Sequence, residues 1–149
     1  MERFVTAIYC EDIRQEVGNK RSLMGIFSGT IFVNEFPVTL LKLCISIQLT
    51  SLASNPVKTL TLKVLKNDEE LSVFNIDESA MSTALSASPR SDETPIESSR
   101  IIVGADIALL NLKLDGPSKF KIRALTESGE LKGPTLEVKL LPNGAVASA

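Results

Sequence analysis

Residues 4–33, FVTAIYCEDIRQEVGNKRSLMGIFSGTIFV, contain the pattern that decides the fold. Apolar residues recur with a period of two over residues 4–12 and again over 22–33, and the turn-forming run 17–20 lies between them. Two such runs joined by a Gly-Asn turn predict a long β-hairpin. Both faces of the first run are largely apolar, which predicts a strand inside a sheet. Gly25 and Gly29 predict a bend that carries the second run from one sheet into another.

The rest of the chain repeats the pattern in shorter runs. Alternation predicts strands at residues 41–52, 58–66, 71–76, 100–115 and 120–125, and a closing strand through residues 136–140. In the run 41–52 the odd positions, from Leu41 to Leu49, are expected to face inward, and Cys44 and Ser46 are expected on the wet face. A change of apolar phase predicts a bulge at Gly104.

About eight strands at this spacing predict an all-β fold, an antiparallel β-sandwich of immunoglobulin-like or jelly-roll-like character. Residues 1–149 are expected to form one such domain, with a mobile Ser-rich loop at 78–99, in which 79–85 can form one or two helical turns, and a loose C-terminal tail at 143–149. Whether the loop is functional or disordered stays open. The predicted core consists of Leu43, Ile45, Ile47, Leu60, Leu62, Leu110, Leu112, Ile122, Val138 and Leu140.

Composition excludes several classes of partner. The 16 Lys and Arg are balanced by 18 Asp and Glu without a basic block, so we expect no nucleic acid partner. Every apolar run is far shorter than the ~20 residues of a membrane helix, and residues 1–4 lack a secretory pattern, so no membrane partner and a cytoplasmic location are expected. Cys10 and Cys44 are expected to be free thiols in such a compartment, and a cross-strand bridge is the alternative.

The sequence carries few groups for catalysis. It contains no histidine, which excludes Ser-His-Asp and Cys-His catalysis and His-ligated zinc. A Gly-x-Ser-x-Gly elbow, a phosphate-binding loop and a Cys-x-x-Cys pair are also missing. We therefore predict no enzyme activity, no catalytic residue, no metal site and no cofactor. The acidic residues between 68 and 78 are expected to be solvated turns, with calcium binding as the weaker alternative.

The charged end of the first hairpin holds the candidate binding residues. They lie on or beside the turn and combine an aromatic ring, three acids and a guanidinium: Tyr9, Glu11, Asp12, Arg14 and Glu16. The main hypothesis is a non-catalytic protein-interaction or structural module that binds a protein partner or a second copy through strand edges and loops. Two alternatives are a domain that binds a nucleotide, sugar or divalent ion, and a carboxylate- or metal-dependent hydrolase using Glu11, Asp12 or Glu16. Surface ion pairing is the simpler explanation for these acids.

A resemblance to a known family covers the same stretch. The segment Cys10-Glu11-Asp12-Ile13-Arg14-Gln15-Glu16, the Gly18-Asn19-Lys20 turn and the Leu23-Met24-Gly25 strand resemble the opening of a family of small uncharacterised proteins from bacteria and their phages. A Pro-x-x-Leu-x-Lys-Leu-Cys stretch of that family is matched by residues 37–44. The resemblance covers about the first third of the chain. It implies a bacterial or phage origin and a shared fold, and it implies no reaction and no ligand.

Overall fold

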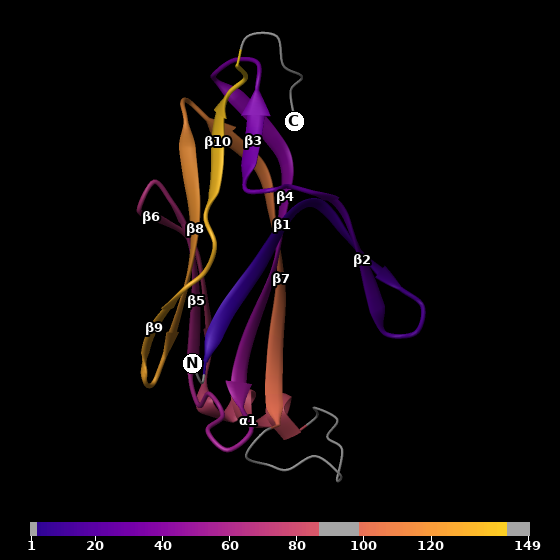
Figure 1. Ribbon diagram of the computed structural model, residues 1–149, viewed down its shortest axis with the longest axis vertical. Helices are drawn as coiled ribbons and strands as arrows, with labels where there is room; N and C mark the ends of the chain where they lie inside the picture. Colours follow the sequence, from indigo (N-terminus) through magenta and orange to yellow (C-terminus); the bar gives the residue numbers. More distant parts are fainter. Residues whose placement is uncertain (1–2, 87–98, 143–149) are drawn as a thin grey trace.

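The computed structural model describes residues 3–86 and 99–142, which form ten strands and one short helix (Figure 1). The elements are, in chain order, β1 (Phe4–Glu16), β2 (Lys20–Ile26), β3 (Thr30–Val33), β4 (Val38–Leu52), β5 (Leu60–Lys66), β6 (Glu69–Ile76), α1 (Glu78–Ser86), β7 (Arg100–Leu114), β8 (Ser118–Thr126), β9 (Gly129–Lys132) and β10 (Leu136–Leu140).

The strands build two sheets that pack face to face. Sheet A has the order β2-β1-β4-β7, and all of its pairs are antiparallel. Sheet B has the order β3-β10-β8-β5-β6, with β9 also paired to β8, and its β3–β10 pair is parallel. The apolar core lies between the two sheets. The predicted β-sandwich is confirmed, and its immunoglobulin-like or jelly-roll-like character stays a prediction.

The second half of the first hairpin changes sheets as predicted. Its first part, β2, pairs with β1 in sheet A, whereas β3 pairs with β10 in sheet B. Gly29 lies between them with φ +95°, in the left-handed region that glycine tolerates best. Because this run divides and β9 forms a strand of its own, the structure has ten strands where about eight were predicted.

The core matches most of the predicted positions. Seven of them are buried: Leu43, Ile45, Ile47, Leu60, Leu62, Ile122 and Val138. Leu112 is partly buried. The prediction is wrong for Leu110 and Leu140, which are 62% and 53% exposed. In β7 the buried residues are Ile107 and Leu109 at odd positions and Leu114 at an even position, so the burial phase changes near Asn111, where φ is +52°. The register is continuous through Gly104, so the bulge predicted there is wrong.

A helix occupies the start of the segment expected to be a mobile loop. The side chain of Asp77 accepts a hydrogen bond from the backbone amide of Ala80 at 2.8 Å and so caps the first turn of α1. Met81, on the same helix, is 1% exposed and belongs to the core. The helical turns expected at 79–85 are confirmed, and the mobility expected for the loop at 78–99 stays a prediction. Residues 87–98 and the expected loose tail at 143–149 lie outside the described residues.

Candidate functional site

A two-stranded arm leaves the sandwich at one edge of sheet A. Strand β1 pairs with β4 only from Phe4 to Cys10, whereas its pairing with β2 continues to Glu16. We call residues 11–25 the arm. Figure 1 shows it projecting from the two stacked sheets, beside the outer face of sheet A. Val17 at its tip is 93% exposed, so the end of the arm contributes nothing to the core.

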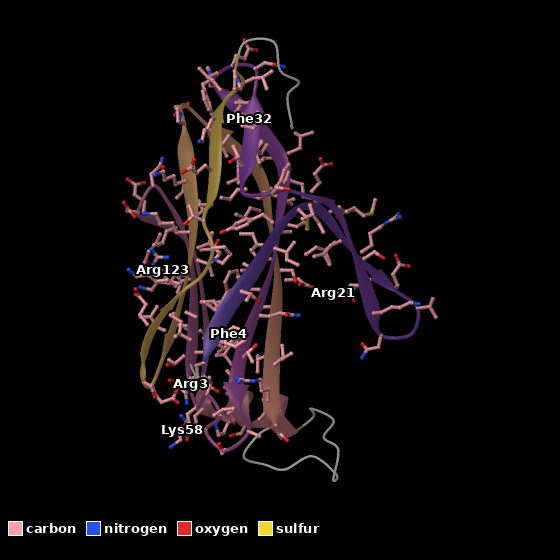
Figure 2. The ribbon with its side chains drawn as sticks, in the orientation of Figure 1. Arg3, Phe4, Arg21, Phe32, Lys58 and Arg123 are labelled. Atoms are coloured by element: carbon pink, nitrogen blue, oxygen red, sulfur yellow. The ribbon has the colours of Figure 1, made fainter. Side chains whose placement is uncertain are left out.

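Charged and polar side chains fasten the arm to sheet A. Arg21 of β2 forms an ion pair with Asp106 of β7, in which Nε lies 3.1 Å from Oδ2, and its Nη2 donates to the hydroxyl of Ser46 on β4 at 2.8 Å. Figure 2 shows Arg21 between the arm and the sheet. At the arm's root, Lys42 donates to Oδ1 of Asp12 at 2.6 Å, and this bond holds the pKa of the Asp12 carboxyl below its usual range. The arm is therefore fastened to sheet A at its root and, through Arg21, part-way along its length.

The two cysteines lie under the root of the arm. Cys10 and Cys44 are directly opposite each other on β1 and β4, on the outer face of sheet A. Both are free thiols, as predicted, and they are 0% and 2% exposed. Burial is the main cause that raises the pKa of each thiol. Cys44 and Ser46 point to the outer face of sheet A as predicted, but they are not solvated, because the arm covers this part of the sheet.

A groove of about 500 Å³ lies beside the arm's root, where the chain passes from sheet A to sheet B. Its lining combines apolar side chains with one acid and one base: Glu11, Phe27, Ile31, Thr39, Leu40, Leu41, Lys42 and Leu43. Leu41 is 74% exposed, and its predicted inward orientation is wrong. Because Leu41 belongs to a contiguous apolar lining and is not an isolated exposed residue, this surface is typical of a binding site.

Tyr9 does not belong to this surface. Its side chain is 4% exposed and points into the sandwich. The hydroxyl donates to the backbone carbonyl of Pro134 at 2.7 Å, and the carbonyl of Phe120 lies 3.4 Å away. Burial raises the pKa of Tyr9 well above its usual value, against the opposing charge of Arg123. Tyr9 thus links the two sheets and is not open to a ligand.

The structure separates the four charged candidates. Glu11 lines the groove, where its side chain lies against Gly25. Asp12 is engaged by Lys42. Arg14 and Glu16 lie further out on the arm and are exposed, and Glu16 is opposite Lys20 in the register of the arm. The five predicted residues therefore do not form one site: Glu11 alone lines the groove, and Asp12 is connected to it only through the ion pair with Lys42.

Sequence reasoning missed three residues of this region. The alternation places Leu41 and Lys42 in a regular strand, and Arg21 lies between the predicted turn and the second run, where the pattern gives it no role. The alternation of Arg21-Ser22-Leu23-Met24 was a usable signal, since it places Arg21 and Leu23 on one face of the arm, and both side chains are half-buried. Nothing in the sequence indicated that this face would lie over sheet A.

The described residues contain no cluster of side chains that could form a metal site. Among residues 3–86 and 99–142, no three His, Cys, Asp or Glu side chains lie close enough to hold a metal ion. Of the acids considered for calcium, Asp68 pairs with Lys121 and Glu70 pairs with Lys63, each at 2.7 Å. The described part of the chain also has no helix long and apolar enough to span a membrane.

Comparison with family models and curated proteins identified no relative of the chain. No protein-family model matches the chain, and no curated protein is significantly similar to it.

Proposed function

We propose that the protein is a non-catalytic interaction module that binds a partner protein at the groove beside the root of the arm. The observation that carries this proposal is Leu41, a large apolar side chain that is 74% exposed at the wall of a groove of about 500 Å³. Leu41 belongs to a contiguous group of apolar lining residues, and apolar side chains that become buried on binding supply much of the affinity of a protein interface.

The chemistry of the groove favours an extended, mainly apolar segment of the partner. Four further apolar residues line the groove beside Leu41: Phe27 is partly buried, and Ile31, Leu40 and Leu43 are buried core residues. Glu11 and Lys42 place one negative and one positive charge along the same groove, which favours a segment with polar groups at its ends. The ion pair between Lys42 and Asp12 holds the arm's root in place before binding, so the partner does not have to order this wall itself.

A matched pair of variants tests this function. Leu41→Asp places a charge in the groove, and Val73→Asp places the same charge on β6, at a residue that is 42% exposed and lies opposite Lys63. Immobilised wild-type protein, Leu41→Asp and Val73→Asp are each exposed to a library of displayed peptides. We expect enrichment of apolar peptides by wild type and Val73→Asp, and loss of these peptides with Leu41→Asp. Equal enrichment by all three proteins, or by none of them, contradicts the proposal.

Binding of a small molecule at the same groove is the second candidate. Its volume of about 500 Å³ lies within the range of roughly 300–1,000 Å³ that is typical of ligand pockets. A thermal-shift screen with nucleotides, sugars and divalent ions tests this, because a ligand at ~100-fold its Kd stabilises a protein by about 2.7 kcal/mol. A shift that Leu41→Asp abolishes favours this candidate. The resemblance described above adds the proposal that the module is of bacterial or phage origin.

A further inference from the structure

Strand β7 forms the edge of sheet A on the far side of β4 from β1, and among the described residues its outer side is unpaired. It runs over 15 residues, and in the described sheets it pairs with β4 alone. Exposed edges of this length are usually blocked by charges, by proline or by a bulge, because they pair readily with other strands. The middle of β7, residues 104–110, contains one charged residue, Asp106, and no proline. Asp106 forms an ion pair with Arg21, so this stretch carries a single, partly compensated charge.

The neighbouring edge of sheet B is open on the same side. Ile76 of β6 and Val103 of β7 line one small cavity between the sheets, which places both strands at this side of the sandwich. Phe74 lies opposite the buried Leu62 and therefore points inward, yet it is 42% exposed. Its ring faces the core, but the described residues leave it partly exposed to solvent. A strand added to β7 would extend sheet A across this side and cover Phe74.

The sequence of β7 is complementary to itself. In an antiparallel pair centred on Ile107, the midpoint of the strand, Gly104 lies opposite Leu110 of the second copy, Ala105 opposite Leu109, and Asp106 opposite Ala108. Each pair sets a small residue against a larger one, and no two like charges face each other directly. The exposed Leu110, for which the monomer offers no cover, would pack over Gly104 of the other copy.

We propose that the protein forms a two-fold symmetric dimer by antiparallel pairing of the free edges of β7, so that the two A sheets become one continuous sheet. The partner is a second copy of this chain, because the register centred on Ile107 satisfies both copies at once, as an isologous contact requires. Figure 1 places α1 at the end of the sandwich where β7 begins, away from the middle of the strand. The groove lies on the other side of β4, where the β1–β4 pairing has ended and residues 39–43 pair with β7 alone. The proposed contact uses the free side of β7 and does not involve the groove residues.

Two substitutions at one exposed position test the pairing. Ala108 would lie opposite Asp106 of the other copy, so Ala108→Asp sets like charges against each other twice, whereas Ala108→Lys sets opposite charges there twice. Sedimentation equilibrium over a series of concentrations should show a dimer for wild type and Ala108→Lys. The dissociation constant of Ala108→Asp should be at least about tenfold higher than that of Ala108→Lys. Thermal unfolding of both variants checks that the monomers fold alike.

Hydrogen exchange locates the contact independently. The amides of residues 104–110 should become more protected as wild-type protein is concentrated, while those of the arm should not change. A wild-type protein that stays monomeric at all concentrations overturns the proposal. So does a dimer that responds equally to both substitutions, or one whose concentration-dependent protection lies outside β7. Peptide binding at the groove is measured separately with Leu41→Asp, so failure of either proposal can be told from failure of the other.

Discussion

The guanidinium of Arg3 lies 2.7 Å from the carboxylate of Glu127, and this ion pair joins the start of β1 in sheet A to the β8–β9 turn of sheet B. The same guanidinium group donates to the backbone carbonyls of Asn55 and Pro56. The second carboxylate oxygen of Glu127 accepts hydrogen bonds from the backbone amides of Lys58 and Thr59. Figure 2 shows Arg3 and Lys58 at the same end of the sandwich. One ion pair therefore ties three segments together across both sheets.

Glu127→Gln should destabilise the protein by about 2 kcal/mol at neutral pH, because it leaves the buried Arg3 without its counter-charge. Burial alone would raise the pKa of Glu127, but the bonds from Arg3 and the backbone amides outweigh it and lower the pKa from 4.5 to about 2. A lowered folded pKa means that the stabilisation is present above pH 4.5 and is lost as the pH falls toward 2. Urea unfolding at a series of pH values measures this.

The control for this substitution is Glu130→Gln, in the neighbouring strand, where the side chain is 47% exposed and lies 3.8 Å from Arg123. It should change stability little. In Glu127→Gln the loss of stability below pH 4.5 should be smaller than in wild type. If the free energy of unfolding falls by the same amount below pH 4.5 in wild type and in Glu127→Gln, the role given to Glu127 is contradicted.

Alternation of apolar residues sufficed to predict the sandwich because burial on one face of each strand is a local property of the chain. Leu43, Ile45 and Ile47 follow it without interruption. It failed at Leu41 and Leu110, since a strand can change its phase where the backbone departs from extended geometry, as at Asn111. A period of two does not show where such a change occurs.

The site was less predictable than the fold because it depends on contacts between distant segments. The pattern places Tyr9 and Cys10 on opposite faces of β1 but does not say which face meets the core. Cys44 and Ser46 are buried because the arm lies over them, and that position depends on the bond from Arg21 to Ser46 and its ion pair with Asp106. Gly25 and Gly29 did reveal the change of sheet, because a positive φ leaves a direct mark on residue choice.

Both native thiols should resist alkylation. Cys10 and Cys44 are buried beneath the arm, and their raised pKa leaves little thiolate at neutral pH. Treatment with a maleimide should label neither residue in the folded protein and both after unfolding in urea, as read by mass spectrometry. Val17→Cys supplies the positive control, since position 17 is 93% exposed and its thiol should react at once. Native labelling of Cys10 or Cys44 as rapid as that of the Val17→Cys thiol contradicts this burial.

Arg21→Ala should loosen the arm without unfolding the sandwich. The substitution removes the ion pair with Asp106 and the hydrogen bond to Ser46, and we expect a loss of about 1 kcal/mol in stability. Amides of β2 should exchange faster, and Cys44 should become accessible to a maleimide. Lys20→Ala is the control, because Lys20 is exposed and lies opposite Glu16 within the arm. If the two variants exchange and react alike, Arg21 does not hold the arm.

Gly25→Ala and Gly29→Ala should both destabilise the protein, and Gly25→Ala should also introduce a steric clash. Each glycine has a positive φ, so alanine should cost about 1–2 kcal/mol at either position. At Gly29 the added methyl group would meet nothing within 4 Å, whereas at Gly25 it would lie 2.7 Å from Cγ and Cδ of Glu11. Glu11→Ala should therefore recover part of the loss in Gly25→Ala and none of it in Gly29→Ala. Equal recovery in both double variants, measured by urea unfolding, contradicts the contact with Glu11.

Tyr9 gives a direct spectroscopic test of the link between the two sheets, because it is the single tyrosine of a chain without tryptophan. Burial raises the pKa of Tyr9, so the folded state holds its proton at a pH where the unfolded state releases it. Stability is then fully present below the ordinary tyrosine pKa of 10.0 and is lost as the pH rises above it. In a titration followed by tyrosinate absorbance and circular dichroism, ionisation should coincide with unfolding. Tyr9→Phe should lose about 1 kcal/mol at neutral pH, because the carbonyl of Pro134 loses its donor. Ionisation of Tyr9 near its ordinary pKa while the fold is intact would show that the hydroxyl is open to water.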